Sequence, residues 1–162
     1  MSHFNIKFRE MTDGEFNKFL ERSILSYSKD LVRAGMDSAK TALINSKKQF
    51  DELLHHGHFT QNQFFYIIES SDNEELGYIW YEKHKENVAY ICNFFILEKF
   101  RKKGYGKQAL LLVEIDAKSK DLNKIFLHVF KFNDNAISLY KSLGYKVFQE
   151  ESGGMYLVKE IL

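Results

Sequence analysis

The sequence predicts a mixed α/β (α+β) fold, in which a twisted and mostly antiparallel sheet of about seven strands is flanked by about four helices. Three observations favour this fold. Stretches with helical periodicity are followed by short apolar and aromatic stretches that are typical of strands. Three of these strand-like stretches are joined only by short polar turns, which indicates antiparallel neighbours. The 162 residues contain no linker or repeat, so residues 1–162 are expected to form a single domain.

The first part of the chain is expected to form one strand and two helices. Residues 4–10 predict the strand. Thr12, with Glu15 three residues later, gives the pattern of a capping box at the start of a helix that ends near Gly35. Residues 38–56 predict the second helix. The apolar residues expected to face inward are Phe16, Phe19, Leu20 and Ile24 in the first helix and Ala42, Leu43, Phe50, Leu53 and Leu54 in the second.

The rest of the chain is expected to form strands with two further helices between them. Residues 64–69, 76–83 and 88–97 are apolar or aromatic and are separated by polar turn residues, which predicts an antiparallel meander. The remaining expected elements are a helix at 107–118, a strand at 125–130, a helix at 134–143 closed by Gly144, and strands at 145–149 and 155–161.

Composition argues against several classes of protein. The net charge of +1 lacks the basic excess of proteins that bind nucleic acids, so no such partner is expected. The single cysteine, Cys92, cannot form an intrachain disulfide, which favours a reducing, cytoplasmic setting. The N-terminal residues lack a signal-peptide core and no apolar run reaches about 18 residues, so no membrane association is expected. The histidines at 55–58 lack a fourth ligand, so no metal is expected.

The strongest chemical signal lies between the third strand of the meander and the next helix. Free N–H groups and the helix dipole make a helix N-terminus a good phosphate site, and glycines let a ligand approach the backbone. The dipole disfavours cations at this end of a helix, so the basic residues there indicate that an anion binds. The loop consists of Arg101, Lys102, Lys103, Gly104, Tyr105, Gly106 and Lys107.

The same loop fits other interpretations to different degrees. A solvated basic turn remains open. A P-loop is excluded, because Gln108 stands where that motif needs Ser or Thr and its first glycine is missing. A dinucleotide fingerprint is matched by Gly104, Gly106 and Ala109, but the next strand ends in Lys131 instead of an acidic residue. The preceding strands also look like hairpins, so an NAD-type dinucleotide site remains the weaker alternative.

Two motifs together resemble those of the GNAT acyltransferases, a superfamily of N-acetyltransferases. The family loop [RQ]-x-x-G-x-[GA] is matched by Arg101, Gly104 and Gly106. The family pattern N-x-x-A-x-x-[LF]-Y-x-x-x-G-[FY] is matched by Asn133, Ala136, Leu139, Tyr140, Gly144 and Tyr145. The motifs occur in the family's order with a strand between them, and the expected element order resembles the GNAT fold along the whole chain.

The resemblance implies a binding mode for acetyl-CoA as co-substrate. The backbone amides of residues 102–107, within the loop that Arg101 begins, would hold the pyrophosphate of the cofactor. The backbone at Phe95 and Ile96 would pair with the pantetheine arm like an added strand. Asn133 would contact the cofactor from the start of the next helix, although it could equally serve only as a helix N-cap.

The resemblance also implies that Tyr140 is the general acid that protonates the departing thiolate. The chemistry is suitable, because the ordinary pKa of a phenol is about 10 and that of a thiol about 8.5. A purely structural role is the alternative, since Ala136, Leu139, Tyr140 and Leu143 form one helical stripe typical of a core.

A general base is harder to identify. Many GNAT enzymes place a Glu on the strand before the glycine loop, but the segment 90–96 has no carboxylate and Cys92 stands near the expected position. A buried cysteine is most often a small apolar residue. His128 is the candidate base, with a core histidine as the alternative, and Glu82, His84 or water are further candidates. The aromatic residues expected to line the acceptor site are Tyr27, Tyr78, Trp80 and Tyr81.

The predicted function is transfer of acetyl from acetyl-CoA directly to a primary amine of a small molecule or a protein. The absence of a carboxylate on the strand leaves a non-catalytic acyl-CoA-binding regulatory module as a second hypothesis, and an NAD-type protein as a third. The expected partners are acetyl-CoA and an amine, and the resemblance allows a homodimer.

Overall fold

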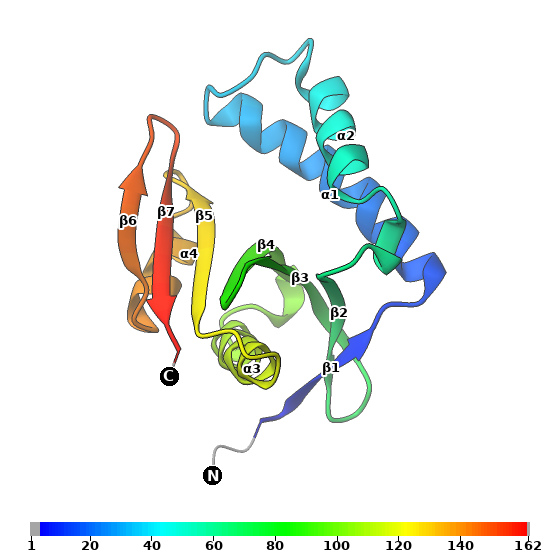
Figure 1. Cartoon of the computed structure of the whole chain (residues 1–162), viewed down its shortest axis with the longest axis vertical. Helices are drawn as coiled ribbons and strands as arrows, with labels where there is room; N and C mark the ends of the chain where they lie inside the picture. The colour runs from blue at the N-terminus through cyan, green and yellow to red at the C-terminus, as the bar shows by residue number, and fades with distance from the viewer. Residues whose placement is uncertain (1–3, 162) are drawn as a thin grey trace.

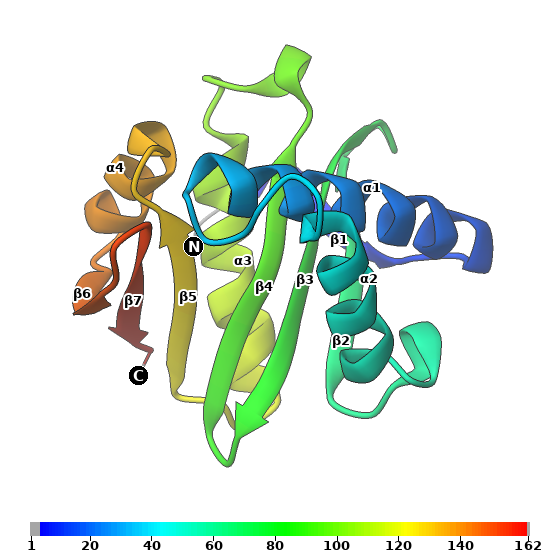
Figure 2. The same ribbon diagram turned by 90° about the horizontal axis from the view of Figure 1, so that it is seen from above.

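The computed structural model describes residues 4–161 and contains one seven-stranded sheet with helices on both faces (Figures 1 and 2). The elements are β1 (Ile6–Glu10), α1 (Asp13–Arg33), α2 (Ala42–Leu53), β2 (Gln63–Ser70), β3 (Glu75–Lys85), β4 (Val88–Ile96), α3 (Tyr105–Ser119), β5 (Lys124–Phe130), α4 (Asp134–Ser142), β6 (Lys146–Glu150) and β7 (Gly154–Glu160), with single 3-10 turns at Gly57–Phe59 and Glu98–Phe100.

The strands lie in the order β1-β2-β3-β4-β5-β7-β6, and every neighbouring pair is antiparallel except β4 and β5. This topology confirms the predicted mixed, mostly antiparallel sheet and its meander. It does not fit the NAD-type alternative, because a dinucleotide fold is built from a series of parallel strands, whereas β4 and β5 are the one parallel pair among the described strands.

The one parallel pair holds together over only part of its length. β4 and β5 pair from Val88 to Ile91 and from Lys124 to Leu127, and beyond these residues the strands separate (Figure 2). A bulge accompanies the separation, since β3 pairs with Ile91 and with Asn93 while Cys92 between them has no partner. Because a bulge bends and twists its strand, this irregularity directs the end of β4 away from β5.

Two hydrophobic clusters lie on opposite faces of the sheet. The larger one packs α3 and α4 against the sheet through fully buried residues, among them Ile79, Leu110, Val113, Ile125 and Leu157. The smaller, aromatic cluster packs α1 and α2 on the other face (Figure 2). It contains Phe16, Phe19, Phe50, Phe65, Tyr78 and Trp80, with Tyr27 and Cys92 packed at its margin.

The predicted helix boundaries hold for α1, α3 and α4 to within two residues, whereas α2 is shorter than the expected 38–56. Its buried stripe is Ala42, Ser46 and Phe50. The expectation that Leu43 and Leu53 face inward is wrong, because they lie off this stripe and are 51% and 37% exposed. The stripe was hard to predict because its middle residue is a serine.

The capping box at the start of α1 is confirmed. The Thr12 hydroxyl accepts from the Glu15 N–H at 3.2 Å, and the Glu15 carboxylate accepts from the Thr12 N–H at 2.9 Å. Each bond satisfies an N–H group that the helix itself leaves free. The box therefore fixes where α1 begins and how the chain enters it from β1.

Replacing Thr12 with Ala should lower the free energy of unfolding by about 1 kcal/mol, because the helix loses its side-chain cap. Urea denaturation measures the change as a shift of the midpoint at constant slope. Thr12→Ser is the matched control, since it keeps a hydroxyl at the same position and should unfold close to the wild type. Equal midpoints for the Ala and Ser variants would contradict this role of the cap.

Candidate active site

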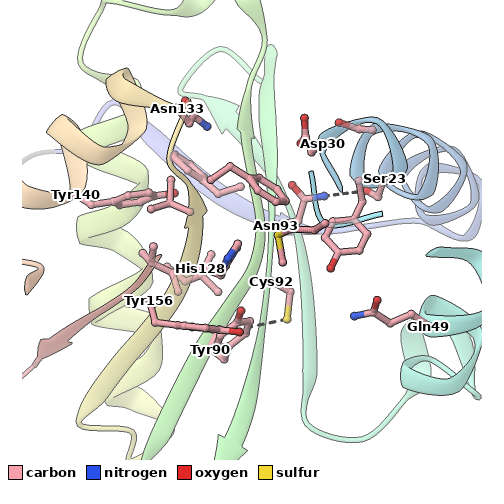
Figure 3. Close-up of a pocket in the computed structure, with 18 of the residues that line it drawn as sticks. Ser23, Asp30, Gln49, Tyr90, Cys92, Asn93, His128, Asn133, Tyr140 and Tyr156 are labelled. Atoms are coloured by element: carbon pink, nitrogen blue, oxygen red, sulfur yellow. Dashed lines mark hydrogen bonds between the residues drawn. The ribbon is translucent and has the colours of Figure 1, made fainter. Parts of the chain in front are cut away.

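A cavity of about 310 Å³ lies where β4 and β5 separate (Figure 3). Its walls come from α1 and α2 on one side of the sheet, from the two separated strands, and from α4 on the other side. The lining residues are Ser23, Ser26, Tyr27, Asp30, Met36, Gln49, Phe50, Tyr90, Ile91, Cys92, Asn93, Phe94, Leu127, His128, Val129, Phe130, Asn133, Tyr140 and Tyr156.

The bulge in β4 determines which side chains reach the cavity. Neighbouring residues of a regular strand point to opposite faces. At the bulge, Cys92 packs against the aromatic cluster, and the next residue, Asn93, also turns toward α1, where its side-chain amide donates to the Ser23 hydroxyl at 3.0 Å. The bulge thereby gives one strand two consecutive side chains on the same face.

Cys92 is unsuited to nucleophilic chemistry. Its thiol lies 3.7 Å from the carbonyl of Tyr90, and burial raises its pKa well above that of a free thiol. The thiolate is the reactive form of cysteine, so a thiol held in this way is inert at neutral pH. The geometry favours the interpretation of Cys92 as a small apolar residue.

His128 extends from β5 into the cavity wall. Its ring packs against those of Phe130 and Tyr156, with centroids at 5.1 and 5.0 Å. Its Nε2 is buried without a hydrogen-bond partner in the described part of the chain, and the nearest carboxylate oxygen, from Glu151, lies 3.7 Å away. Burial lowers the pKa of His128, while Glu151 opposes this effect. The imidazole is therefore neutral at pH 7.

A glycine in the neighbouring strand makes room for this imidazole. Gly154 pairs with Phe130 across β5 and β7, and a Cβ at this position would lie 2.3 Å from Nε2 of His128. Any other residue would displace the ring. The close approach of backbone and imidazole explains the glycine.

Tyr140 reaches the cavity from α4, on the opposite side of the sheet from α1 (Figure 3). The side chain is almost fully buried and its ring packs against that of Tyr145 at 5.7 Å. Burial raises the pKa of Tyr140 to about 12. The hydroxyl therefore keeps its proton throughout the neutral range.

Asn133 occupies the N-cap position of α4 and also lines the cavity. Its side chain makes no capping hydrogen bond; its backbone N–H donates to the carbonyl of Phe130 at 2.9 Å, and its carbonyl accepts from the N–H of Ile137 at 3.0 Å. Asn133 is thus the N-cap residue of α4, but its side chain does not cap the helix. The amide remains available to a ligand.

The glycine loop presents unpaired N–H groups at the start of α3. The N–H of Arg101 donates to Glu98 and that of Gln108 to Gly104, and within residues 4–161 the N–H groups between these two have no hydrogen-bond partner. Lys102 and Gly104 adopt positive φ angles of 61° and 85°, which turn the chain into the helix. The result is a concave row of donors of the kind that binds anions.

Not all the basic residues of this loop are free. The Arg101 Nε donates to the carbonyl of Ile96 at 2.8 Å, and its guanidinium lies over the ring of Phe95 at 4.9 Å. Arg101 thus ties the loop to the end of β4. Lys102, Lys103 and Lys107 are exposed. At the helix start, Gly106 lies close to Leu139 of α4 and Phe94 of β4, which places the loop beside the cavity wall.

The last residues of β4 lie beyond its pairing with β5. The Phe95 side chain stacks on Tyr78 at 5.4 Å, on the face of α1, so only its backbone is available on the side of β5. The carbonyl of Ile96 is already used by Arg101. The unpaired edge of β4 nevertheless leads from the loop toward Cys92.

Several expected site residues lie elsewhere. Glu82 and His84 do not line the cavity and pair with each other at 3.3 Å, with His84 exposed. Of the four aromatic residues expected at the acceptor site, Tyr27 lines the cavity, whereas Tyr78, Trp80 and Tyr81 are buried in the two cores. No group of three or more metal-ligating side chains occurs within residues 4–161, and none of the helices described there is long and apolar enough to cross a bilayer.

Sequence reasoning missed Asp30, Tyr90, Tyr156 and Glu151. Asp30 lines the cavity from α1, and burial raises the pKa of its carboxyl. Glu151 lies beside His128 from the turn between β6 and β7. No local pattern marks these residues, because only the packing of α1 and of that turn against β5 brings them to the site.

Comparison with known proteins identifies relatives along most of the chain. The model of the acetyltransferase (GNAT) family matches residues 32–145. Two proteins of Bacillus subtilis, the uncharacterized N-acetyltransferases YdgE and YycN, are 29% and 31% identical over 139 residues. These alignments cover 84% of this chain and 88% and 89% of the relatives.

Solved structures show the same fold. The crystal structure of YycN superposes with a TM-score of 0.82 at 32% identity, covering 90% of this chain and 93% of that protein. The structure of the PaiA N-acetyltransferase of Thermoplasma acidophilum in complex with coenzyme A has a TM-score of 0.71 at 20% identity and covers 97% of this chain and 99% of the other.

The native thiol of Cys92 should react with iodoacetamide at pH 7.5 at least roughly tenfold more slowly than a free thiol, because burial raises its pKa well above the ordinary value and leaves little thiolate. Alkylation followed by mass spectrometry measures the rate. In denaturing urea the same thiol should react at the rate of a free cysteine. Rapid alkylation of the folded protein would contradict the buried, protonated state.

Proposed function

The chain belongs to the acetyltransferase (GNAT) family, and from this premise we propose that it transfers the acetyl group of acetyl-CoA directly to a primary amine of a small molecule or a protein. One observation carries the proposal. Tyr140 and the bulged part of β4 line one cavity at the separation of β4 and β5, and the row of free N–H groups at the start of α3 lies next to its wall, where Gly106 approaches Phe94.

The loop supports the cofactor half of the proposal. The free N–H groups at 102–107 and the helix dipole suit a pyrophosphate, which carries its charge in oxygen acceptors. Lys102, Lys103 and Lys107 are exposed and add positive charge around the same point. Arg101 contributes by holding the loop against Ile96, so its role is to position the backbone that binds the cofactor.

The open edge of β4 supports the placement of the pantetheine arm. This arm contains two amide groups, and an extended amide chain can pair with an unpaired strand edge as a peptide does. The backbone at Phe95, together with the residues toward the bulge, offers that edge. Asn133, whose side chain has no capping bond, faces the cavity from the other side. A chain bound along β4 would end with its thioester near Tyr140.

Tyr140 is the proposed general acid. Its raised pKa, about 12, keeps the proton on the hydroxyl until a stronger base arrives. A thiolate in water is a weaker base than this phenolate, but burial of the thiolate in the same cavity penalises its charge as well and raises its affinity for the proton. The hydroxyl therefore stabilises the leaving sulfur by a hydrogen bond and then by its proton. His128, neutral in its buried position, is the proposed base for the amine.

The lining of the cavity supports a cationic acceptor. Among its described residues, Asp30 is the one carboxylate, and none is Lys or Arg. The rings of Tyr27, Tyr90 and Tyr156 add faces that favour cations. An amine with a second positive charge fits this lining. An acceptor that carries a carboxylate as well as its amine, as an amino acid does, would bring an unpaired anion into the cavity.

The proposed function is tested by calorimetric titration with acetyl-CoA and by a panel of amines with detection of the released thiol. We expect saturable cofactor binding and turnover. Diamines should be acetylated at least about tenfold faster than amino acids of similar length, since a tenfold preference needs only about 1.4 kcal/mol of differential binding. Asp30→Asn should reduce this preference. Absence of cofactor binding at millimolar acetyl-CoA would overturn the proposal.

Replacing Tyr140 with Phe should lower kcat by about 100-fold, the lower end of the usual contribution of a general acid, and should leave the dissociation constant of acetyl-CoA nearly unchanged. Stopped-time assays and calorimetry give the two quantities. Tyr145→Phe is a matched control, because Tyr145 packs against Tyr140 but does not line the cavity. Unchanged turnover in Tyr140→Phe would remove Tyr140 from the proposed mechanism.

A further inference from the structure

We propose that Glu151 is a positioning residue that orients His128 and stabilises its protonated form during removal of the proton from the acceptor amine. This inference rests on the proposed function and adds to it a residue from the turn between β6 and β7. The turn spans residues 151–153 and lies next to the end of β5.

The turn holds both partners of the pair in place. The N–H of Glu151 donates to the carbonyl of Gly154 at 2.8 Å, which closes the turn. At the first residue of the turn, the Glu151 carboxylate lies 3.7 Å from Nε2 of His128. Directly after the turn, Gly154 leaves the space that the imidazole occupies. A bond from the Lys131 N–H to the carbonyl of Gly153 fixes the turn to the end of β5.

The arrangement selects one tautomer of the imidazole. Nε2 is buried and the Glu151 carboxylate, 3.7 Å away, is the charged acceptor beside it, so the neutral ring is most stable with its proton on Nε2. The lone pair then lies on Nδ1, the other ring nitrogen, of a side chain that lines the cavity. Figure 3 shows His128 with Tyr140 on one side and Cys92 on the other.

Other titratable groups face His128 from each element around it. They are Tyr27 and Asp30 on α1, Tyr90 and Cys92 on β4, Tyr140 on α4 and Tyr156 on β7. The pKa of every one of these phenols and of the thiol is raised, so they are neutral near pH 7. Glu151 is the charged group that acts on the pKa of His128, and it opposes the effect of burial.

The proton balance of the step is complete. Nδ1 of His128 takes one proton from the bound ammonium group, which becomes a neutral amine, and the imidazolium is paired with the Glu151 carboxylate. The amine attacks the thioester carbon, the C–S bond breaks, and the thiolate takes the proton of Tyr140, which regains one from the amide nitrogen. After product release, Nδ1 of His128 gives this proton to water that enters the cavity, which restores the neutral ring with its proton on Nε2.

The pH dependence of kcat/KM tests the pair. In the wild type, activity should fall on the acid side as His128 becomes protonated. Glu151→Gln removes the charge that favours the imidazolium, so the acid limb, which is the fall of kcat/KM at low pH, should move down by about one pH unit. The plateau, which is the maximal kcat/KM, should fall about tenfold because a weaker base remains. Glu151→Asp should restore part of both. A role that is only structural would lower the plateau without moving the limb.

Glu150→Gln is the matched control. Glu150 is the neighbouring residue, is 60% exposed and lies near Lys131 at 3.8 Å, away from His128. Its replacement should leave both the limb and the plateau unchanged. A second measurement needs no substrate: the NMR titration of the His128 ring should give a lower pKa in Glu151→Gln than in the wild type and the same pKa in Glu150→Gln.

Two results would overturn the inference. One is an acid limb and an NMR pKa that stay the same in Glu151→Gln. The other is a rise in the KM of the amine alone, which would make Glu151 part of the acceptor site. If the wild type acetylated no amine at all, the proposed function would fail, whereas the NMR comparison would still decide whether Glu151 acts on His128.

Discussion

The site depends on a limit to strand pairing. β4 and β5 can share hydrogen bonds only as far as Ile91 and Leu127, because the bulge at Cys92 turns β4 away. Past that point the sheet has an opening lined by backbone groups and by side chains from both faces. The cavity, its access to α4 and the free edge of β4 all follow from this separation, so the irregularity of one strand creates the room that the proposed reaction needs.

Local patterns made most of the fold predictable. The cap at Thr12, the glycine loop and the Asn133–Tyr145 motif each depend on residues that are close together in the sequence. The order of the elements follows from the periodicity of apolar residues. Tyr140 and Asn133 could be placed at the cavity for the same reason. The bulge at Cys92, the stripe of α2 and the approach of Glu151 could not, because each results from packing between segments far apart in the chain.

Burial shifts the pKa values of the two proposed proton carriers in opposite directions, and in both cases the uncharged form results. It raises the pKa of Tyr140 and lowers that of His128, and both groups are therefore uncharged at neutral pH. An uncharged acid and an uncharged base can coexist in a small cavity without the cost of isolated charges. The lysines of the glycine loop are exposed at the surface where the anionic part of the cofactor is expected.

The separate hydrophobic clusters have a consequence for how such a protein can diverge. The wall formed by α1 and α2 rests on the aromatic cluster of one face, whereas α3, α4 and the start of the glycine loop rest on the core of the other. Distant, independent sites respond additively to substitution. Mutations in α1 and α2 can therefore accumulate and change the proposed acceptor wall, while the opposite core keeps α4 and the start of the glycine loop in place.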